Sequence, residues 1–205
     1  MISFGFRIQT IAFILFVALA TYYCASKNYL VVNYQLPSEP VTVQETEISL
    51  IFKDQRTEQI LVTQSAKSAL KDFSGNFALI VASGNKNERL LGAFSLSSMM
   101  ETIFRQRFEN AGVRVAPQNE SRPTAVEIIL KEFKLDLIKR KWVVQVTYQA
   151  NLLEEDRFKG GQTISGNAER LRVVGSKDAE MVIGELLTDA VNRLNLDELF
   201  DSSGS

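Results

Sequence analysis

The alternation of apolar and polar residues predicts a long hairpin in the second half of the chain. Residues 124–137 and 142–152 form its two arms, and a short basic turn lies between them. In the second arm every other residue from Trp142 to Leu152 is apolar, which places these side chains on one face of a sheet. In the first arm the alternation shifts by one residue near Lys131, so we expect a β-bulge there.

Shorter strands are predicted on both sides of this hairpin, at residues 47–53, 77–82, 113–116 and 162–174. The first of them alternates, whereas the second is a nearly continuous apolar run. We expect the turn before the last strand to contain Glu154 to Asp156 together with Gly160 and Gly161. The sheet built from these strands is predicted to be antiparallel.

Two helices are predicted from apolar residues at helical spacing. The first covers residues 95–111, and either Ser95 or Ser98 can cap its start. The second covers residues 176–194, with Ser176 as the capping residue. The pattern as a whole therefore predicts an α+β fold, with an antiparallel sheet, a long central hairpin and two main helices packed on one face.

The chain length of 205 residues is that of one domain with an export segment. Pro37 and Pro40 favour an extended backbone before the first alternating strand. We therefore divide the chain into a signal peptide or membrane anchor (1–25), an extended tether (26–44), a single periplasmic α+β domain (45–200) and a flexible tail (201–205).

The N-terminal segment has the features of an export signal, because Arg7 precedes an uninterrupted apolar run from Ile11 to Ala20. Three readings remain open. A leader peptidase can cleave after Ala20. Alternatively, Cys24 is acylated, although Tyr23 stands where a lipoprotein signal has a small residue. In the third reading the segment stays as an anchor, although its apolar stretch is shorter than the ~20 residues that cross a bilayer.

Composition excludes several classes of function. The chain has no histidine and one cysteine, so it lacks the commonest general base and cannot form an internal disulfide or a thiolate metal cluster. The formal net charge of -1 gives no reason to expect a nucleic-acid partner. Phosphate-loop, dinucleotide-binding and serine-hydrolase motifs are not present in the sequence. We therefore expect no enzymatic activity, no catalytic residues, no cofactor and no metal.

Several short signatures occur together in this chain. They are Tyr-x-Leu-Pro at 34–37, Asp54-x-Arg56 at a strand end, Gly-Val-x-Val at 112–115, the long hairpin and the C-terminal helix. In this combination the chain resembles the YajG-like and transport-auxiliary small periplasmic lipoproteins over about residues 34–200. The resemblance implies a periplasmic domain associated with the outer membrane and without catalysis, in a group where some members are accessory subunits of lipid or lipopolysaccharide transport machines. The bulky Tyr23 before Cys24 departs from the lipoprotein signal.

Three candidate sites follow from the sequence. Cys24 is a candidate for lipid attachment. Asp54 and Arg56 are a candidate polar site at a strand end, or an ion pair that stabilises a turn. The basic turn of Lys139, Arg140 and Lys141 is a candidate contact with an anionic surface, or an ordinary solvated turn. Aromatic residues at regular spacing are expected to be core, although they can also line a groove; these are Phe104, Phe108, Trp142 and Tyr148.

These observations predict a non-enzymatic protein of a Gram-negative-type cell envelope. It is expected to be associated with a membrane through its N-terminus, at the outer membrane if it is lipidated and at the inner membrane if the signal is not cleaved. Its expected role is that of an accessory or structural partner of another envelope protein, in an assembly or transport system. The alternative is a module that binds lipid or lipopolysaccharide in a gap between its sheet and its helices.

Overall fold

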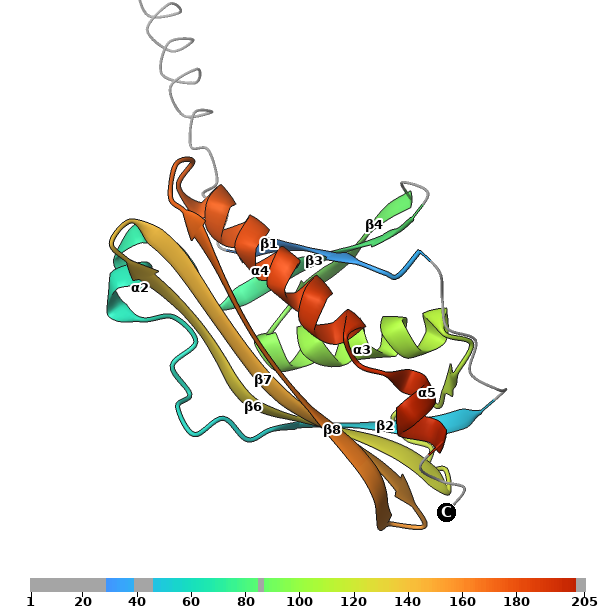
Figure 1. Cartoon of the computed structure of the whole chain (residues 1–205). Coiled ribbons are helices and arrows are strands. Elements are labelled where there is room, and N and C mark those ends of the chain that lie inside the picture. The colour runs from blue at the N-terminus through green and yellow to red at the C-terminus, as the bar shows by residue number, and fades with distance from the viewer. Residues whose placement is uncertain (1–28, 39–45, 85–86, 202–205) are drawn as a thin grey trace, which may run out of the picture.

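The structure is a computed structural model that describes residues 29–38, 46–84 and 87–201. Its strands form a five-stranded sheet in the order β5-β2-β6-β7-β8 and a three-stranded sheet in the order β1-β3-β4 (Figure 1). The strands are β1 (Tyr29–Gln35), β2 (Glu47–Asp54), β3 (Asn76–Ser83), β4 (Asn87–Phe94), β5 (Arg114–Val115), β6 (Thr124–Ile138), β7 (Lys141–Glu154) and β8 (Arg157–Leu171). The helices are α2 (Gln64–Ala69), α3 (Leu96–Asn110), α4 (Ser176–Asn192) and α5 (Leu196–Asp201). The α+β class is confirmed.

The predicted long hairpin is present as β6 and β7. The register between these strands shifts between Leu130 and Glu132, so Lys131 is the bulge residue, as predicted. The apolar side chains of β7 alternate with polar ones and are buried on one face. β8 continues the sheet and begins at Arg157, directly after the β7 turn. The prediction that Gly160 and Gly161 belong to that turn is wrong, because both lie within β8.

The prediction of an antiparallel sheet is wrong for part of the fold, because both sheets are mixed. β6, β7 and β8 are antiparallel, but β2 pairs in parallel with β5 and β6, and β1 pairs in parallel with β3. Parallel neighbours require a long crossover, and between β2 and β6 the chain passes through α2, β3, β4, α3 and β5. Alternation shows which face a side chain occupies, but it carries no information on the direction of the neighbouring strand.

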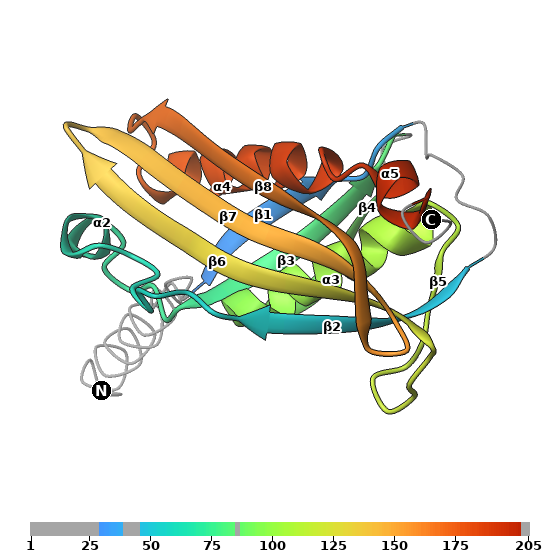
Figure 2. The ribbon, with the colours of Figure 1, turned by 60° about the horizontal axis from the view of Figure 1, so that its bottom comes forward.

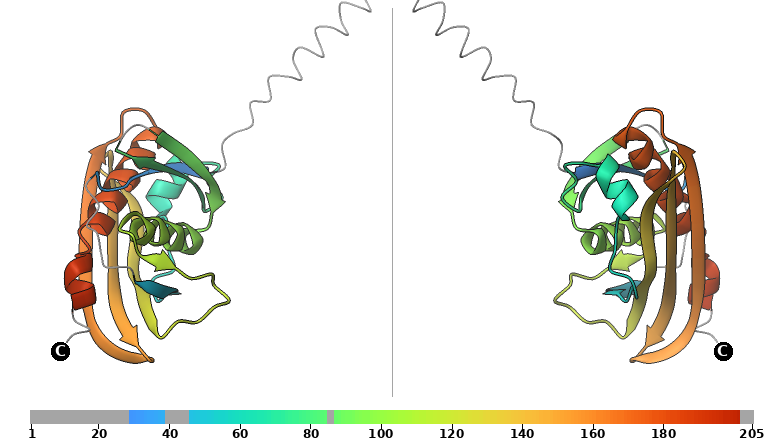
Figure 3. Two further views of the ribbon diagram at one scale, coloured as in Figure 1. Left: turned by 90° about the vertical axis from the view of Figure 1, so that its right-hand side faces the viewer. Right: turned by 90° about the vertical axis from the view of Figure 1, so that its left-hand side faces the viewer.

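The two main helices, α3 and α4, lie against one face of the five-stranded sheet (Figures 2 and 3). The hydroxyl of Ser95 accepts a hydrogen bond from the backbone N–H of Ser98 at 3.3 Å, so Ser95 is the cap of α3. The apolar stripes of both helices are buried against the sheet, as their spacing predicts. The ring of Phe104 from α3 meets the ring of Tyr148 from β7 edge to face, with centroids 4.9 Å apart.

The prediction that residues 26–44 form an extended tether is wrong for residues 29–35, which form β1. This strand pairs with β3 along its whole length, and its side chains Leu30, Val32 and Tyr34 are buried in the core. The folded domain therefore includes residues 29–35 and does not begin at residue 45. Pro37 and Pro40 favour an extended backbone at their own positions, but they do not prevent the alternating residues before them from pairing as a strand.

The free edge of β1 is covered by α4. Three side chains of α4 hydrogen-bond the backbone of this strand, and their spacings of eight and four residues place them on one face of the helix; they are Glu180, Thr188 and Asn192. Gly184 lies in the same row, where a Cβ atom would approach the carbonyl oxygen of Asn33 to 2.6 Å. Because glycine has no side chain, the helix can approach the strand closely enough for these bonds. Backbone groups at the edge of β1 thereby gain hydrogen-bond partners from α4.

Candidate functional site

Asp54 and Arg56 form a fixed ion pair at the end of β2. Nε of Arg56 donates to Oδ1 of Asp54 at 2.9 Å, and Nη2 donates to Oδ2 at 2.8 Å. The hydroxyl of Ser97 in α3 donates to the same carboxylate at 3.2 Å. Hydrogen bonds from Arg56 lower the pKa of Asp54, despite partial burial. Both carboxylate oxygens are therefore engaged in holding the loop after β2 against the start of α3.

The basic turn between β6 and β7 is a two-residue hairpin loop. Lys139 and Arg140 both have positive φ angles, of 47° and 68°, as the central residues of a type I′ turn require. Asparagine and glycine favour this conformation, whereas long side chains adopt it at a cost. Lys141 lies just inside β7, where its ammonium group pairs with Glu169. The structure therefore presents Lys139 and Arg140 at the tip of the hairpin.

The loop between β8 and α4 is held in place by hydrogen bonds. The backbone N–H groups of Val173 and Val174 both donate to Oδ2 of Asp178, and these bonds lower the pKa of that carboxyl group. Nε1 of Trp142 donates to the carbonyl of Gly175 at 3.1 Å. Ser176 therefore does not cap α4 as predicted; the capping position is Gly175, which has no side chain to do so. Although the loop is fixed, the two valine side chains are 75% and 62% exposed.

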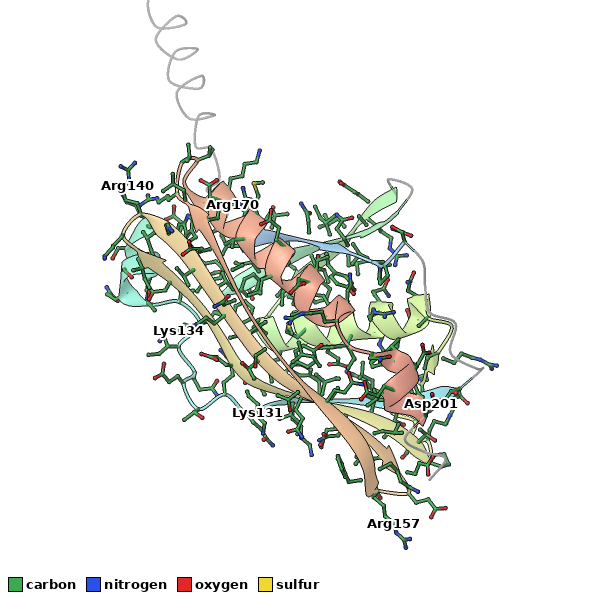
Figure 4. All side chains as sticks on the ribbon, viewed as in Figure 1. Lys131, Lys134, Arg140, Arg157, Arg170 and Asp201 are labelled. Atoms are coloured by element: carbon green, nitrogen blue, oxygen red, sulfur yellow. The ribbon has the colours of Figure 1, made fainter. Side chains whose placement is uncertain are left out.

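The hairpin turn and this loop lie together at the end of the domain where β1 begins. The backbone N–H of Arg172 donates to the carbonyl of Arg140 at 2.8 Å. Tyr29 and Ser176, the first residues of β1 and α4, line one surface pocket of about 310 Å³. We call this surface the basic end, and it comprises Tyr29, Ile138, Lys139, Arg140, Leu171, Arg172, Val173, Val174 and Lys177. Figure 4 shows Arg140 at this end and Arg157 and Asp201 at the opposite end.

The basic end combines exposed aliphatic side chains with cations that form no ion pair in the described part of the chain. Leu171 and Ile138 are 54% and 49% exposed, in addition to the two valines. Within the described residues, no ion pair involves Lys139, Arg140, Arg172 or Lys177. At the opposite end, the turn between β7 and β8 carries the carboxylates of Glu154, Glu155 and Asp156 together with Arg157, and Lys159 pairs with Glu154. Carboxylates also lie near the basic end, in Asp72, Asp178 and Glu180. The basic end is therefore distinguished by cations that form no ion pair within the described ranges.

The space between the five-stranded sheet and the helices is filled by side chains. Phe104, Phe108, Trp142 and Tyr148 are all fully buried there. Arg107 of α3 is also buried, and burial lowers the pKa of its guanidinium group. Burial raises the pKa of the Tyr148 hydroxyl, which donates to a backbone carbonyl of α4. The aromatic residues that could have lined a groove are therefore part of the core.

Two findings, on metal binding and on membrane-spanning helices, apply to residues 29–38, 46–84 and 87–201. Among these residues no group of three or more acidic or sulfur side chains is arranged to hold a metal ion. Over the same part of the chain, no helix combines the length and apolar character needed to span a bilayer. Cys24, the signal segment (1–25) and most of the predicted tail (201–205) lie outside the described residues.

Comparison with solved structures supports the fold. Protein XCC0632 from Xanthomonas campestris, which carries the family-model name DUF330, superposes with a TM-score of 0.55 at 14% identity, over 86% of this chain and 96% of that chain. The chain shares the fold of XCC0632. Weaker similarities include rare lipoprotein B from Shewanella oneidensis (TM-score 0.41, 8% identity, 76% and 96% covered) and a minor lipoprotein from Acinetobacter baumannii (TM-score 0.34, 10% identity, 77% and 96% covered). No protein-family model and no curated protein sequence matches the chain.

The sequence predicts only the cationic turn of the basic end, from three consecutive basic residues. The pattern of residues 162–174 instead places Arg172, Val173 and Val174 in the last predicted strand. The signal for this loop is Gly175, a turn-favouring residue directly after Val174, whereas the two valines themselves favour a strand. Their position beside the hairpin turn depends on strand pairing, which the local pattern does not contain.

Proposed function

We propose that this chain is a non-enzymatic envelope protein, held at a membrane by its N-terminal segment, whose domain is an accessory or structural partner in an envelope assembly or transport system. The single observation that carries the proposal is the position of β1. This core strand begins only five residues after Cys24, so a segment with export features leads almost directly into the folded domain.

The shared fold with XCC0632 is consistent with this proposal. The packed interior favours an accessory role over the alternative of a lipid-binding module. That alternative requires an open gap between sheet and helices, and fully buried aromatic side chains occupy this space. A partner is therefore expected to bind the outer surface of the domain.

Export and attachment can be tested on the complete chain. A β-lactamase fused after Ser205 should confer resistance, because the domain is exported. Metabolic labelling with a clickable fatty acid, compared between the wild type and Cys24→Ser, then separates the three readings of the N-terminus. Label on the wild type that is lost in Cys24→Ser indicates acylation of Cys24. If the wild type carries no label, its mass separates the other two readings, because cleavage after Ala20 shortens the chain and an uncleaved anchor leaves it at full length. A fusion that is active only in the cytoplasm contradicts the proposal.

The accessory role requires a partner in the envelope. We expect the complete chain, extracted with mild detergent after chemical crosslinking, to migrate in a complex well above its own mass of 23.0 kDa, together with a second envelope protein. Native mass spectrometry of the purified chain tests the alternative, because a lipid-binding module should retain a stoichiometric lipid. Monomeric behaviour with bound lipid contradicts the accessory role.

A further inference from the structure

We propose that the basic end is a docking surface for an anionic phospholipid membrane, which holds the domain against the bilayer in one orientation. This inference rests on the proposed attachment through the N-terminus and adds a second contact to it. Three observations carry it: the reach of the chain before β1, the uncompensated cations, and exposed valines on a rigid loop.

The first observation is geometric. Cys24 and Tyr29 are five residues apart, and five residues span at most about 18 Å even when fully extended. If the chain is attached at Cys24, Tyr29 lies within that distance of the lipid interface, and an anchor that ends earlier extends the reach by about 3.5 Å for each additional residue. Tyr29 lines a pocket together with Ser176, the first residue of α4. The end of the domain that is nearest to the bilayer is therefore the basic end.

The second observation is electrostatic. Lys139 and Arg140 project from the tip of the β6–β7 hairpin, and Arg172 is hydrogen-bonded to that turn through its backbone. Lys177 also lies at this end, at the start of α4, but it is beside the carboxylate of Asp178. Each cation close to an anionic membrane strengthens binding by roughly fivefold, so Lys139, Arg140 and Arg172 together provide a substantial attraction.

The third observation is the pair of exposed valines. Val173 and Val174 are held outward because Asp178 accepts hydrogen bonds from both of their backbone N–H groups. A loop that is already ordered loses little conformational entropy when its side chains enter the interface. Each valine that is fully buried in lipid should favour the docked state by roughly tenfold. Aliphatic side chains surrounded by cations suit a surface of acyl chains and phosphate groups.

The chain carries its own reporter for this contact. Trp142 is the only tryptophan in the sequence, and its indole lies directly beneath the loop, where it donates to Gly175. Spin-labelled phosphatidylcholine quenches tryptophan fluorescence only at short range. Quenching of Trp142 in vesicles therefore measures how close the basic end is to the lipid headgroups, while flotation of the same vesicles measures attachment of the chain.

The experiment uses the purified complete chain with vesicles of phosphatidylcholine, alone or mixed with phosphatidylglycerol. We expect flotation with both kinds of vesicle, because the N-terminal segment attaches to each. Quenching of Trp142 should be strong only with phosphatidylglycerol and should decrease at high salt, which screens the charges. Flotation without charge-dependent quenching overturns the docking proposal and leaves the proposed attachment intact. Failure to float with either vesicle overturns both.

Two double variants test the surface itself. Lys139→Asn with Arg140→Gly removes two cations and places the residues that a type I′ turn prefers, so this variant should melt at a higher temperature and dock roughly 25-fold more weakly. Val173→Ser with Val174→Ser should also reduce quenching, with an unchanged fold.

The matched controls lie at the opposite end of the domain. Arg157→Gln and Phe158→Ser should change neither the flotation of the vesicles nor the quenching of Trp142; Phe158 is 63% exposed. The proposal is contradicted if both double variants show the same quenching of Trp142 as the wild type. It is also contradicted if the control variants lose this quenching. If the basic end instead recognises an acidic protein, the vesicles show no charge-dependent quenching.

Discussion

Replacement of Gly184 by alanine is predicted to destabilise the protein, although helix propensity alone predicts the opposite. Within a helix, alanine is favoured over glycine by about 1 kcal/mol. In this structure, however, a Cβ at residue 184 would lie 2.6 Å from the carbonyl oxygen and 3.2 Å from the nitrogen of Asn33. Both are backbone atoms of β1, which cannot rotate away. The helix must therefore move away from the strand.

The size of the effect follows from what this movement disturbs. Restoring an ordinary contact requires α4 to retreat by roughly 0.8 Å at this point. The retreat strains the bonds that connect α4 to β1, such as that from the Gln35 N–H to Thr188 Oγ1 at 3.1 Å. Overpacking costs roughly 1 to 3 kcal/mol, and the two bonds one helical turn away, at Glu180 and Thr188, add about 1 kcal/mol each when they are weakened. After subtraction of the propensity gain, we expect a net loss of roughly 2 to 4 kcal/mol.

Thermal and chemical denaturation of Gly184→Ala measure this loss directly. For a domain of this size the melting temperature should fall by roughly 5 to 15 °C. Met181→Ala is the matched control, because Met181 lies in the same helix with 41% of its surface exposed, and it should melt close to the wild type. If Gly184→Ala melts at or above the wild-type temperature, the close approach of α4 to β1 is wrong and helix propensity decides the outcome.

Two further predictions concern the core and the ion pair. Phe104→Ala should cost roughly 3 to 5 kcal/mol in the free energy of unfolding, because it empties a fully buried site beside Tyr148; a variant that melts like the wild type but loses a partner would show that α3 is a recognition surface. Asp54→Asn should cost roughly 1.5 to 3 kcal/mol near neutral pH, because it removes a charged hydrogen-bond acceptor of Arg56. Since the folded pKa of Asp54 is lowered, its contribution is complete above the unfolded value of about 3.9 and is lost as the pH falls through the folded pKa. Urea titrations should therefore show the wild type and Asp54→Asn converging in acid, and a constant difference between them would contradict this assignment.

The sequence by itself determined the elements whose signal is local. Alternation located the β6–β7 hairpin and its bulge at Lys131, and helical spacing located α3 and the apolar stripe of α4. These features depend on side-chain periodicity, which is written into short stretches of chain. The pairing of Asp54 with Arg56 also lies within reach of the sequence, because the two residues are separated by a single position.

The tertiary structure alone decided the direction of the strands, the role of β1 and the composition of the basic end. In the parallel pairing of β2 with β6, Leu50 lies beside Val126, which is far away along the chain. No local pattern in the sequence specifies the direction of such a distant neighbouring strand. The residues before Pro37 become a core strand because β3 supplies one edge and α4 covers the other. In the same way, the cations of the hairpin turn meet Val173 and Val174 only because β8 pairs with β7 and returns its end to that turn. Contacts between distant segments depend on the free energy of the whole fold, whereas periodicity depends only on neighbours along the chain.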